Sequence, residues 1–345
     1  MKINGVSLGD ALVPYVIAEM SGNHRNEYKF AEKLLVECAT NGANAFKLQT
    51  YTPDSMTLNC KRPEYFVGNS PWEGKNLYEL YAQGQTPAEW IPDLFEVARE
   101  SKISIFSTPF SFKDVDILEE NEVSAYKIAS FEITYTQLLK YVGKTGKPVI
   151  FSTGMATLEE IRRAFETLGE AGAREISILK CSTSYPAHPK KLNFLTIPYL
   201  INTYGVPVGF SDHTIGTVAA IAAVALGATV LEKHVKLDED QTSVDASFSL
   251  PVSALKEYID VARTSALSRG GVQNGPTDDE ETYMQYRRSI VASRNIEKGE
   301  IISHHNVRIV RPALGLAPEK LDSIIGLRSA RFIEFGEGIT FDNIS

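Results

Sequence analysis

The chain has 345 residues, of which 43% are apolar and 23% charged, and its formal net charge at pH 7 is −8. This is the composition of a globular protein with room for one large domain and a small one. The negative charge argues against a general role in binding nucleic acid or a membrane surface, although it leaves room for a local basic pocket that holds a small anion.

The three cysteines, Cys38, Cys60 and Cys181, are widely spaced and form no CxxC pair. Their odd number and spacing argue against a disulfide framework and favour reduced thiols. The first residues lack the apolar segment of a signal peptide, and the longest apolar run, 218–226, is too short to span a bilayer. These features predict a cytoplasmic protein.

Short apolar runs rich in β-branched residues and bounded by turn residues predict eight strands. Helical periodicity fills the spaces between them, as in 28–41, in the alanine-rich 217–226 and in 157–171, which opens with a capping-box pair, Thr157 and Glu160. No dinucleotide-binding glycine fingerprint follows the first strand. The pattern therefore predicts a (β/α)₈ TIM barrel, of class α/β, rather than an open doubly wound sheet. The strands are expected at 15–20, 45–49, 103–107, 125–130, 149–152, 175–181, 206–210 and 228–235.

One connection, 51–92, is far too long for a simple crossover between strands. It contains the aromatic residues Tyr65, Trp72, Tyr78 and Tyr81. Long loops in compact domains are usually functional or mobile. We expect this segment to form a loop with a short helix over the barrel mouth.

The pattern changes after about Arg269, where glycine-containing turns and the acidic run 278–281 indicate a linker. Short β-like pieces follow from Ser289 onward. We expect a barrel domain at 1–275, a linker at 276–288 and a small β-rich domain at 289–345. A domain this small buries little core by itself, so we expect it to pack on a partner surface.

Polar side chains are predicted to gather at the carboxyl ends of the strands, where barrel active sites lie. The last two strands run into His213 and His234, and two neutral imidazoles on neighbouring strands can hold a divalent cation. Lys47, Lys127 and several hydroxyls converge on the same mouth and suit a phosphate or carboxylate. The strand ends also supply Glu19, Asn23, His24, Gln49, Thr50, Ser107, Thr108, Ser130, Glu132, Ser152, Thr153, Cys181, Ser182, Thr183, Ser184, Tyr185, Ser211, Asp212, Thr214, Glu232 and Lys233.

Each of these residues, taken singly, has an ordinary structural alternative. A lone lysine at a strand end is usually a solvated charge, a Ser-Thr pair is usually a helix cap, and a lone histidine is usually a hydrogen-bonded structural group. His24 is one such residue, since it can simply close a turn. The other histidines, His188, His304 and His305, are expected at the surface. Placement of so many polar groups at one predicted edge favours a functional site.

The strand-end motifs resemble those of the sialic acid synthases, and the resemblance covers nearly the whole chain. They are Ile17-Ala18-Glu19-Met20-Ser21-Gly22-Asn23-His24, Lys47-Leu48-Gln49-Thr50-Tyr51, Ser107-Thr108-Pro109-Phe110, Tyr126-Lys127-Ile128-Ala129-Ser130, Ser152-Thr153-Gly154-Met155, Phe210-Ser211-Asp212-His213-Thr214 and Glu232-Lys233-His234. Ile296-Glu297-Lys298-Gly299-Glu300 and Arg311-Pro312 resemble the antifreeze-like (SAF) domain of that family. Within the family, the stretches 47–52, 72–78 and 183–187 are most similar to pseudaminic acid synthases.

The resemblance implies an enzyme that condenses phosphoenolpyruvate with an N-acylated aldose and water, giving a nine-carbon nonulosonic acid and phosphate. For a pseudaminic acid synthase, the acceptor would be 2,4-diacetamido-2,4,6-trideoxy-L-altrose. The resemblance also implies a homodimer in which the small domain of one subunit caps the active site of the other.

Residue roles follow from the same resemblance. His213 and His234 would bind Mn²⁺ or Mg²⁺, Glu132 would carry a proton near the attacking water, and Arg311 would reach the sugar from the small domain. The catalytic set would be Glu132, Lys127, His213 and His234. Phosphoenolpyruvate would be held by Lys47, Thr108, Lys127, Ser130, Ser152 and Ser211. The sugar would be faced by Gln49, Tyr185 and Asp245, and Thr183 is a further expected substrate contact.

Two positions near the expected sugar site depart from the family pattern. The stretch 242–250 keeps Asp245 but lacks the usual Gly-Pro-Asp, and Arg25 stands where a small or amide residue is commoner. An N-acetylneuraminate or legionaminate synthase is therefore an alternative. A catalytically silent sugar- or phosphate-binding protein is an alternative of a different class, which the intact lysines and histidines disfavour. An ice-binding role for the small domain is disfavoured by its arginines, Arg308, Arg311, Arg328 and Arg331.

Overall fold

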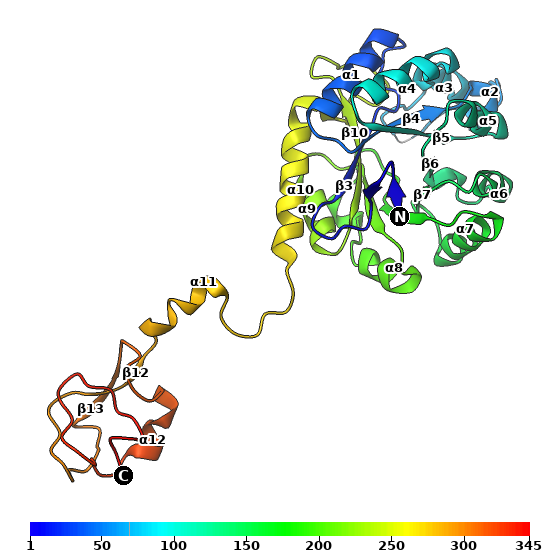
Figure 1. Cartoon of the computed structure of the whole chain (residues 1–345). Coiled ribbons are helices and arrows are strands. Elements are labelled where there is room, and N and C mark those ends of the chain that lie inside the picture. The colour runs from blue at the N-terminus through cyan, green and yellow to red at the C-terminus, as the bar shows by residue number, and fades with distance from the viewer. Residues whose placement is uncertain (69) are drawn as a thin grey trace. The chain divides into compact units, whose positions relative to one another are not determined.

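Eight parallel strands close into a barrel in the computed structural model, which describes residues 1–68 and 70–345 (Figure 1). The last strand, β10, pairs with both β9 and β3 and so completes the ring. This confirms the predicted (β/α)₈ fold. The barrel strands are β3 (Tyr15–Glu19), β4 (Ala45–Thr50), β5 (Ser104–Pro109), β6 (Tyr126–Ile128), β7 (Val149–Ser152), β8 (Ile176–Cys181), β9 (Val208–Asp212) and β10 (Val230–Lys236).

Eight helices surround the strands and bury their apolar faces against them (Figure 1). They are α1 (Tyr28–Thr40), α4 (Ile91–Glu100), α5 (Phe112–Glu120), α6 (Thr136–Lys144), α7 (Leu158–Ala171), α8 (Thr196–Tyr204), α9 (Val218–Ala225) and α10 (Leu255–Arg269). Short 3₁₀ turns are found at Pro63–Tyr65, Ala88–Trp90, Ser130–Glu132, Pro189–Lys191, Val252–Ala254, Met284–Tyr286 and Pro318–Lys320. The short strands β1 (Lys2–Ile3), β2 (Val6–Ser7) and β11 (Leu250–Pro251) lie outside the ring.

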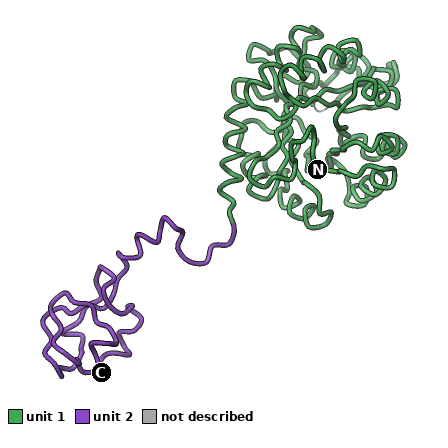
Figure 2. Tube along the Cα trace, in the orientation of Figure 1, with its two compact units in different colours: residues 1–270 green, residues 271–345 purple. Residues whose placement is uncertain are grey.

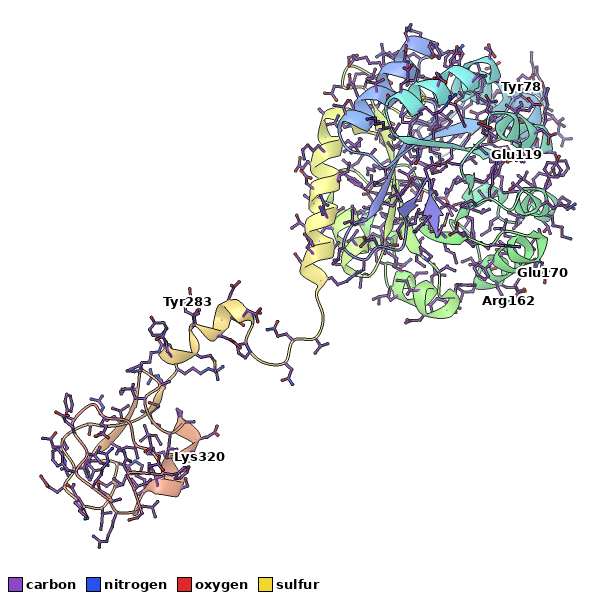
Figure 3. All side chains as sticks on the ribbon, viewed as in Figure 1. Tyr78, Glu119, Arg162, Glu170, Tyr283 and Lys320 are labelled. Atoms are coloured by element: carbon purple, nitrogen blue, oxygen red, sulfur yellow. The ribbon has the colours of Figure 1, made fainter. Side chains whose placement is uncertain are left out.

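Helix α7 shows how local sequence sets an element. The Thr157 hydroxyl accepts a hydrogen bond from the Glu160 N–H at 3.2 Å, and the Glu160 carboxylate accepts one from the Thr157 N–H at 2.8 Å. This is the predicted capping box, and it satisfies N–H groups that have no partner within the helix. One face of the helix is buried against the barrel, while Arg162 and Glu170 are exposed at its outer edge (Figure 3).

The long connection after β4 contains two short helices, α2 (Pro53–Met56) and α3 (Leu77–Gly84). The Asn76 side chain caps α3 by accepting a hydrogen bond from the Tyr78 N–H at 3.0 Å. The sequence predicted one helix here. The additional α2 begins at Pro53, behind a capping box that Thr52 and Ser55 form.

The chain divides into two compact units, Met1–Gly270 and Gly271–Ser345 (Figure 2). The second unit contains an antiparallel pair, β12 (Ser289–Ala292) and β13 (Val307–Val310), and the short helices α11 (Asp278–Glu281) and α12 (Leu321–Ile324). It has its own small isoleucine-rich core. The helix α11 lies inside the segment predicted as a linker, and the linker bounds themselves stay a prediction.

The second unit contains two copies of the same turn, and equivalent residues of the two copies are separated by the same number of residues along the chain. Arg294 pairs with Glu300 in the first copy, and Arg331 pairs with Glu337 in the second. Ile296 and Ile333 hold equivalent positions in the two copies, and each donates its backbone N–H to the carbonyl of the other at 2.9 Å. The two copies are therefore related by a local twofold.

None of the helices formed by residues 1–68 and 70–345 combines the length and the apolar character needed to cross a bilayer.

Candidate active site

A pocket of about 800 Å³ opens at the carboxyl ends of the barrel strands. Residues from the strand ends, from the β4–α3 connection and from the β10–β11 loop line it. Most of the predicted site residues line this pocket. They are Lys47, Gln49, Thr108, Lys127, Ser130, Glu132, Ser152, Thr183, Tyr185, Ser211, His213, His234 and Asp245.

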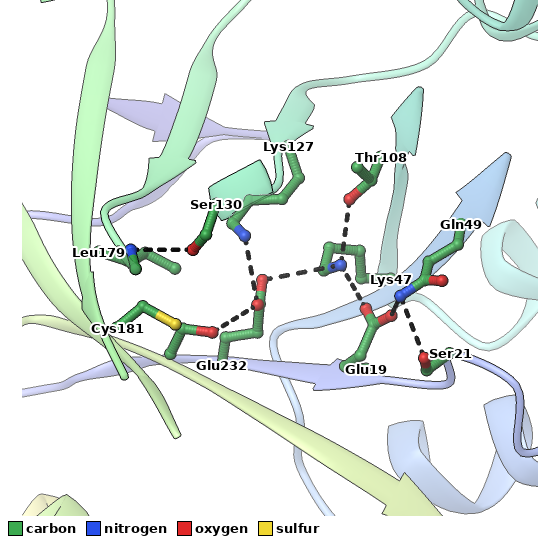
Figure 4. A network of polar contacts seen from close by, with 12 residues as sticks. Glu19, Ser21, Lys47, Gln49, Thr108, Lys127, Ser130, Leu179, Cys181 and Glu232 are labelled. Carbon is green, nitrogen blue, oxygen red and sulfur yellow. Dashed lines mark hydrogen bonds and ion pairs between the residues drawn. The ribbon is translucent and has the colours of Figure 1, made fainter. Parts of the chain in front are cut away.

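Two lysines and two carboxylates form a buried cluster at the pocket floor (Figure 4). The Lys47 ammonium lies 2.6 Å from the Glu19 carboxylate and 3.9 Å from that of Glu232, and the Lys127 ammonium lies 3.3 Å from Glu232. Burial alone disfavours a charged carboxylate, but Lys127 and Lys47 outweigh it and lower the pKa of Glu232. Burial raises the pKa of Glu19, against the opposing effect of Lys47. The charged form is thus favoured more strongly at Glu232 than at Glu19, and the two lysines can still pair with a further anion.

Hydroxyl groups border this cluster. The Ser152 and Thr183 hydroxyls are buried and find no hydrogen-bond partner among the described residues. The Ser130 hydroxyl accepts a hydrogen bond from the Gly154 N–H at 3.0 Å. Buried hydroxyls without partners are costly unless a ligand uses them. Together with the lysines, they suit a phosphate or carboxylate.

Gly154 permits this arrangement. A Cβ atom at position 154 would lie 1.9 Å from the Thr183 hydroxyl oxygen and 2.8 Å from that of Ser130. Only a residue without a side chain allows the loop after β7 to approach both hydroxyls. The predicted Ser-Thr-Gly motif therefore has a steric reason for its glycine.

The imidazoles of His213 and His234 meet at the pocket wall, with ring centroids 5.3 Å apart. The Nδ1 atom of His213 lies 3.1 Å from the Ser182 carbonyl oxygen, which requires a proton on Nδ1 and leaves Nε2 available. The Nδ1 atom of His234 is buried and lacks a partner within the described part of the chain. Burial and the neighbouring His213 lower the pKa of His234, which favours the neutral, metal-binding form.

This pair fits an open cation site, in which the protein supplies two nitrogen ligands and substrate or water supplies the others. Within residues 1–68 and 70–345, no group of three or more His, Cys, Asp or Glu side chains is arranged to hold a metal alone. The aromatic ring of Tyr185 packs over His213, with centroids 4.3 Å apart.

Glu132 faces the pocket from the turn after β6. Burial raises the pKa of its carboxyl group to about 7, and its Oε2 atom has no partner in the part of the chain that the structure describes. A carboxyl group that titrates near neutral pH suits proton transfer.

Asp245 lines another part of the same pocket, together with several aromatic side chains. Its carboxylate accepts hydrogen bonds from the Ser21 hydroxyl at 2.5 Å and from the Gly22 N–H at 3.3 Å. The Gln49 side chain donates to Ser21 at 3.0 Å and to Glu19 at 3.1 Å. A chain of hydrogen bonds thus joins the lysine cluster to Asp245.

Aromatic rings form the wall beside Asp245. The Trp72 indole donates to the Val244 carbonyl at 2.8 Å, and its ring centroid lies 5.4 Å from Tyr185 and 5.9 Å from Phe248. The altered loop around Asp245 is therefore tied to the β4–α3 connection. Both segments stand out in the sequence, but nothing in the sequence indicates that they contact each other.

Arg25 does not line the pocket, so the expectation that this substitution borders the sugar site is corrected. The Arg25 guanidinium instead donates to the Asp240 carboxylate at 3.1 Å and lies over the Phe30 ring. His24 is buried and accepts a hydrogen bond from the Asn26 N–H at 3.0 Å, so it closes a turn, as the alternative interpretation held. The histidines expected at the surface, His188, His304 and His305, are exposed.

Arg311 lies in the second unit, in a groove of about 620 Å³. The groove is lined by Arg311 together with Tyr283, Tyr286, Arg287 and Arg288. It is a positively charged, aromatic surface, which suits a polar or anionic partner.

Glu19 and Glu232 had no role in the sequence-based assignment, although both stand in the quoted motifs. Each pairs with a lysine on another strand, and the pairing follows from barrel register. Glu19 on β3 lies directly opposite Lys47 on β4.

Comparisons with known proteins agree with this geometry. Residues 34–274 match the model of the NeuB family, and residues 287–345 match that of the SAF domain. The chain is 39% identical over 328 residues to pseudaminic acid synthase of Campylobacter jejuni subsp. jejuni serotype O:23/36 (strain 81-176), covering 94% of this chain and 95% of that protein. It is 31% identical over 350 residues to N,N'-diacetyllegionaminic acid synthase of Legionella pneumophila, covering 99% and 98%. The crystal structure of N-acetylneuraminic acid (sialic acid) synthetase from Leptospira borgpetersenii, in complex with citrate, is similar with a TM-score of 0.74 and 26% identity, over 82% of this chain and 94% of that one.

Proposed function

The chain belongs to the NeuB family, and we propose that it condenses phosphoenolpyruvate with an N-acylated aldose and water, releasing phosphate. We propose 2,4-diacetamido-2,4,6-trideoxy-L-altrose as the acceptor and pseudaminic acid as the product. The observation that carries this proposal is one pocket in which a buried lysine cluster, a histidine pair and an apolar wall lie together. The similarity to a pseudaminic acid synthase over most of the chain supports the choice of acceptor.

Phosphoenolpyruvate would occupy the lysine end of the pocket. Lys47 and Lys127 would pair with its phosphate and carboxylate, and the hydroxyls would supply directed hydrogen bonds. Those hydroxyls belong to Thr108, Ser130, Ser152, Thr183 and Ser211. The unpartnered hydroxyls of Ser152 and Thr183 support this placement, because an anion would satisfy them.

His213 and His234 would hold a divalent cation, Mn²⁺ or Mg²⁺. When bound, such a cation supplies Lewis-acid polarisation of the acceptor aldehyde. The Nδ1 atom of His234 has no partner among the described residues, and the contact of His213 Nδ1 with the Ser182 carbonyl leaves its Nε2 atom available, which supports this assignment.

The enolic C3 of phosphoenolpyruvate would attack the aldehyde carbon, and water would add at C2. Glu132 would take the proton of that water, since its pKa lies near neutral. The proton taken by Glu132 balances the proton that the aldehyde oxygen takes up as it becomes a hydroxyl. The hydroxyl that water leaves at C2 then becomes the keto oxygen and gives its proton to the departing phosphate as the C2–O bond breaks. Lys47 and Lys127 would stabilise the charge of that phosphate. Both substrates held in one buried pocket would gain from proximity.

The sugar would lie between Asp245 and the aromatic wall of Trp72, Tyr185 and Phe248. Two N-acetyl methyls and a 6-deoxy methyl give the proposed acceptor an unusually apolar surface for a sugar. The apolar wall supports such an acceptor over a fully hydroxylated hexosamine. It does not separate pseudaminate from legionaminate synthesis, because a diacetylated acceptor suits both. Legionaminate synthesis is therefore the second candidate, supported by the Legionella relative.

We also propose a cytoplasmic homodimer in which Arg311 of one subunit reaches the sugar in the other. The free thiols of Cys38, Cys60 and Cys181 support a reducing compartment. The charged groove around Arg311 supports a surface that meets a polar ligand.

Phosphate release and product mass would test the proposal. The purified protein is mixed with phosphoenolpyruvate, Mn²⁺ and a panel of acceptors that includes N-acetylmannosamine and both diacetamido-trideoxyhexoses. We expect phosphate and a nonulosonic acid with the altrose-configured acceptor. Acceptor binding without phosphate release under all conditions would instead indicate the silent binding protein.

A further inference from the structure

We propose that Asp212, Lys233 and Tyr258 form a buried clamp outside the pocket that positions His213 and His234. These three residues, named here the outer clamp, would be positioning residues and would not touch substrate. The inference rests on the proposed function in so far as the two histidines act in the reaction.

The outer clamp is a closed set of hydrogen bonds. The Asp212 Oδ2 atom accepts from the Lys233 ammonium at 3.0 Å and from the Tyr258 hydroxyl at 3.1 Å. The Asp212 Oδ1 atom accepts from the backbone N–H of Thr214 at 2.8 Å and from its hydroxyl at 2.7 Å. Lys233 also donates to the Thr214 carbonyl at 2.5 Å. Thr214 is thereby held by its N–H, its side chain and its carbonyl.

Strand alternation places the clamp directly behind the histidines. Asp212 and Lys233 lie opposite each other in the β9–β10 register, and each immediately precedes a histidine. Ser211 and Glu232, one residue earlier, line the pocket, as do the histidines themselves. Because neighbouring strand residues point to opposite faces, Asp212 and Lys233 point outward, where Tyr258 of α10 meets Asp212.

His213 therefore sits between two fixed points. Asp212 precedes it at the end of β9, and Thr214 follows it, tied to Asp212 and Lys233. On β10, the same Lys233 precedes His234. A single buried ion pair thus joins the two short segments that carry the imidazoles, and it limits how far one ring can move relative to the other.

A simple stabilising role explains this pair less well. Lys233 and Asp212 are each 1% exposed. Apart from the lysine–carboxylate cluster in the pocket, no other ion pair within residues 1–68 and 70–345 has both side chains so deeply buried. Burying two charges costs free energy that apolar side chains would not cost, so a buried pair is weak evidence for stability. Its directional bonds are well suited to fixing geometry.

The test compares two variants of helix α10 in the full chain. Tyr258→Phe removes one hydrogen bond to Asp212 without leaving a charge unpaired. Ser265→Ala is the matched control, because the Ser265 hydroxyl donates to the Ile221 carbonyl at 2.8 Å and is not one of the groups that hydrogen-bond in the clamp. Mn²⁺ affinity is measured by titration calorimetry without substrate, alongside kcat, KM for phosphoenolpyruvate and the melting temperature.

We expect Tyr258→Phe to weaken Mn²⁺ binding by about tenfold and to lower kcat, as loss of a partner behind a metal ligand does. KM for phosphoenolpyruvate should change little, because the lysine cluster is not touched. Ser265→Ala should leave affinity and kcat unchanged at a similar melting temperature. Equal affinity and kcat in Tyr258→Phe and Ser265→Ala would overturn the proposal.

Thr214→Val provides a second variant, since it removes the hydroxyl bond to Asp212 and keeps the ion pair. It should show the same loss of Mn²⁺ affinity as Tyr258→Phe. A wild-type protein that binds no Mn²⁺ would refute the metal role of the histidines and not the clamp. In that case crystal structures decide: a His213 ring that moves relative to His234 in Tyr258→Phe supports the clamp, and an unmoved ring overturns it.

Discussion

Lys47 and Glu19 lie side by side on neighbouring barrel strands, with the ammonium nitrogen 2.6 Å from a carboxylate oxygen and both side chains buried. A buried lysine needs a partner, and here the partner belongs to the pocket itself. An anion that binds beside Lys47 and Lys127 would meet donors that are already fixed in place.

Substitution of either lysine is expected to impair phosphoenolpyruvate binding selectively. Lys47→Ala or Lys127→Ala should raise KM for phosphoenolpyruvate far more than KM for the sugar, because loss of a charge-assisted contact to a buried anion costs about 2–5 kcal/mol. Lys256→Ala is the control, since this exposed lysine pairs with Asp260 on the outer surface. Steady-state kinetics with each substrate varied in turn measures the split. Unchanged phosphoenolpyruvate dependence in both variants would place the anion elsewhere.

Removal of divalent cations is expected to abolish condensation, and Mn²⁺ or Mg²⁺ should restore it. His213→Ala and His234→Ala should each lower turnover by orders of magnitude and weaken cation binding, with the fold retained. His188→Ala, which alters an exposed histidine, should behave as the wild type. Far-ultraviolet circular dichroism checks the fold, and a phosphate-release assay with excess chelator checks the activity. Full activity in chelator would disprove the cation site.

Glu132 is expected to set the acidic limb of the pH–rate profile. Its pKa is raised to about 7 by burial, so a base at this position becomes competent as the pH rises through about 7. Glu132→Gln should remove that limb and lower kcat by about 10²–10⁴-fold. An unaltered profile in Glu132→Gln would assign the proton transfer to another group.

The same carboxyl group makes a stability prediction with a defined sign. Its pKa in the folded state lies above the ordinary glutamate value of 4.5, so the protonated form is favoured by folding. That contribution is fully present below about pH 4.5 and is lost as the pH rises through about 7. Glu132→Gln should therefore raise the melting temperature relative to the wild type at pH 8 more than at pH 5. Thermal unfolding at the two pH values measures the difference, and an equal shift at both would refute it.

Gly154→Ala is expected to disturb the hydroxyl groups beside the lysines. The added methyl group must displace Thr183 and Ser130, which should cost about 1–3 kcal/mol of stability and raise KM for phosphoenolpyruvate. Gly169→Ala in helix α7 is the matched control, because its new methyl group meets nothing within 4 Å. That control should be neutral or stabilising by up to about 1 kcal/mol. Similar kinetics for both variants would show that the close approach at Gly154 is not needed.

Subunit mixing tests the role of Arg311. Arg311→Ala and His213→Ala should each be inactive alone, and a mixture that exchanges subunits should recover part of the activity. Recovery is expected because a mixed dimer contains one site with both parts intact. Arg308→Ala, on strand β13 in the same unit, should stay active. Exchange confirmed by mass spectrometry with no recovered activity would exclude a shared site.

The sequence predicted the barrel because its signal is local. Apolar, β-branched runs end in turn residues, so each strand end was located within a few residues. Polar residues at those strand ends, such as Lys127 and His234, therefore line the same pocket. Strand β6 is shorter than expected, since the 3₁₀ turn Ser130–Glu132 begins inside the predicted run.

The contacts that complete the site join residues far apart in the sequence, and the sequence pattern does not predict them. Trp72 bonds to Val244, 172 residues away, and Lys127 reaches Glu232 across the barrel. Such pairs depend on register and loop path. Arg25 shows the opposite kind of error, in which a residue is expected at the site and does not lie there. It stands next to a site motif in the sequence, but its side chain pairs with Asp240 and does not line the pocket.

The twofold in the second unit also bears on how that unit folds. Ile296 and Ile333 hold equivalent positions in the two copies and hydrogen-bond to each other through their backbones. The Gly299 N–H donates to the Ser329 carbonyl, and in the same way the Gly336 N–H donates to the Ala292 carbonyl. Each copy therefore supplies hydrogen-bond partners for the backbone groups of the other. Neither copy can complete its hydrogen bonds alone. The unit is in effect an intramolecular dimer, of the kind that tandem duplication of a short segment produces, and its halves should unfold together in one cooperative step.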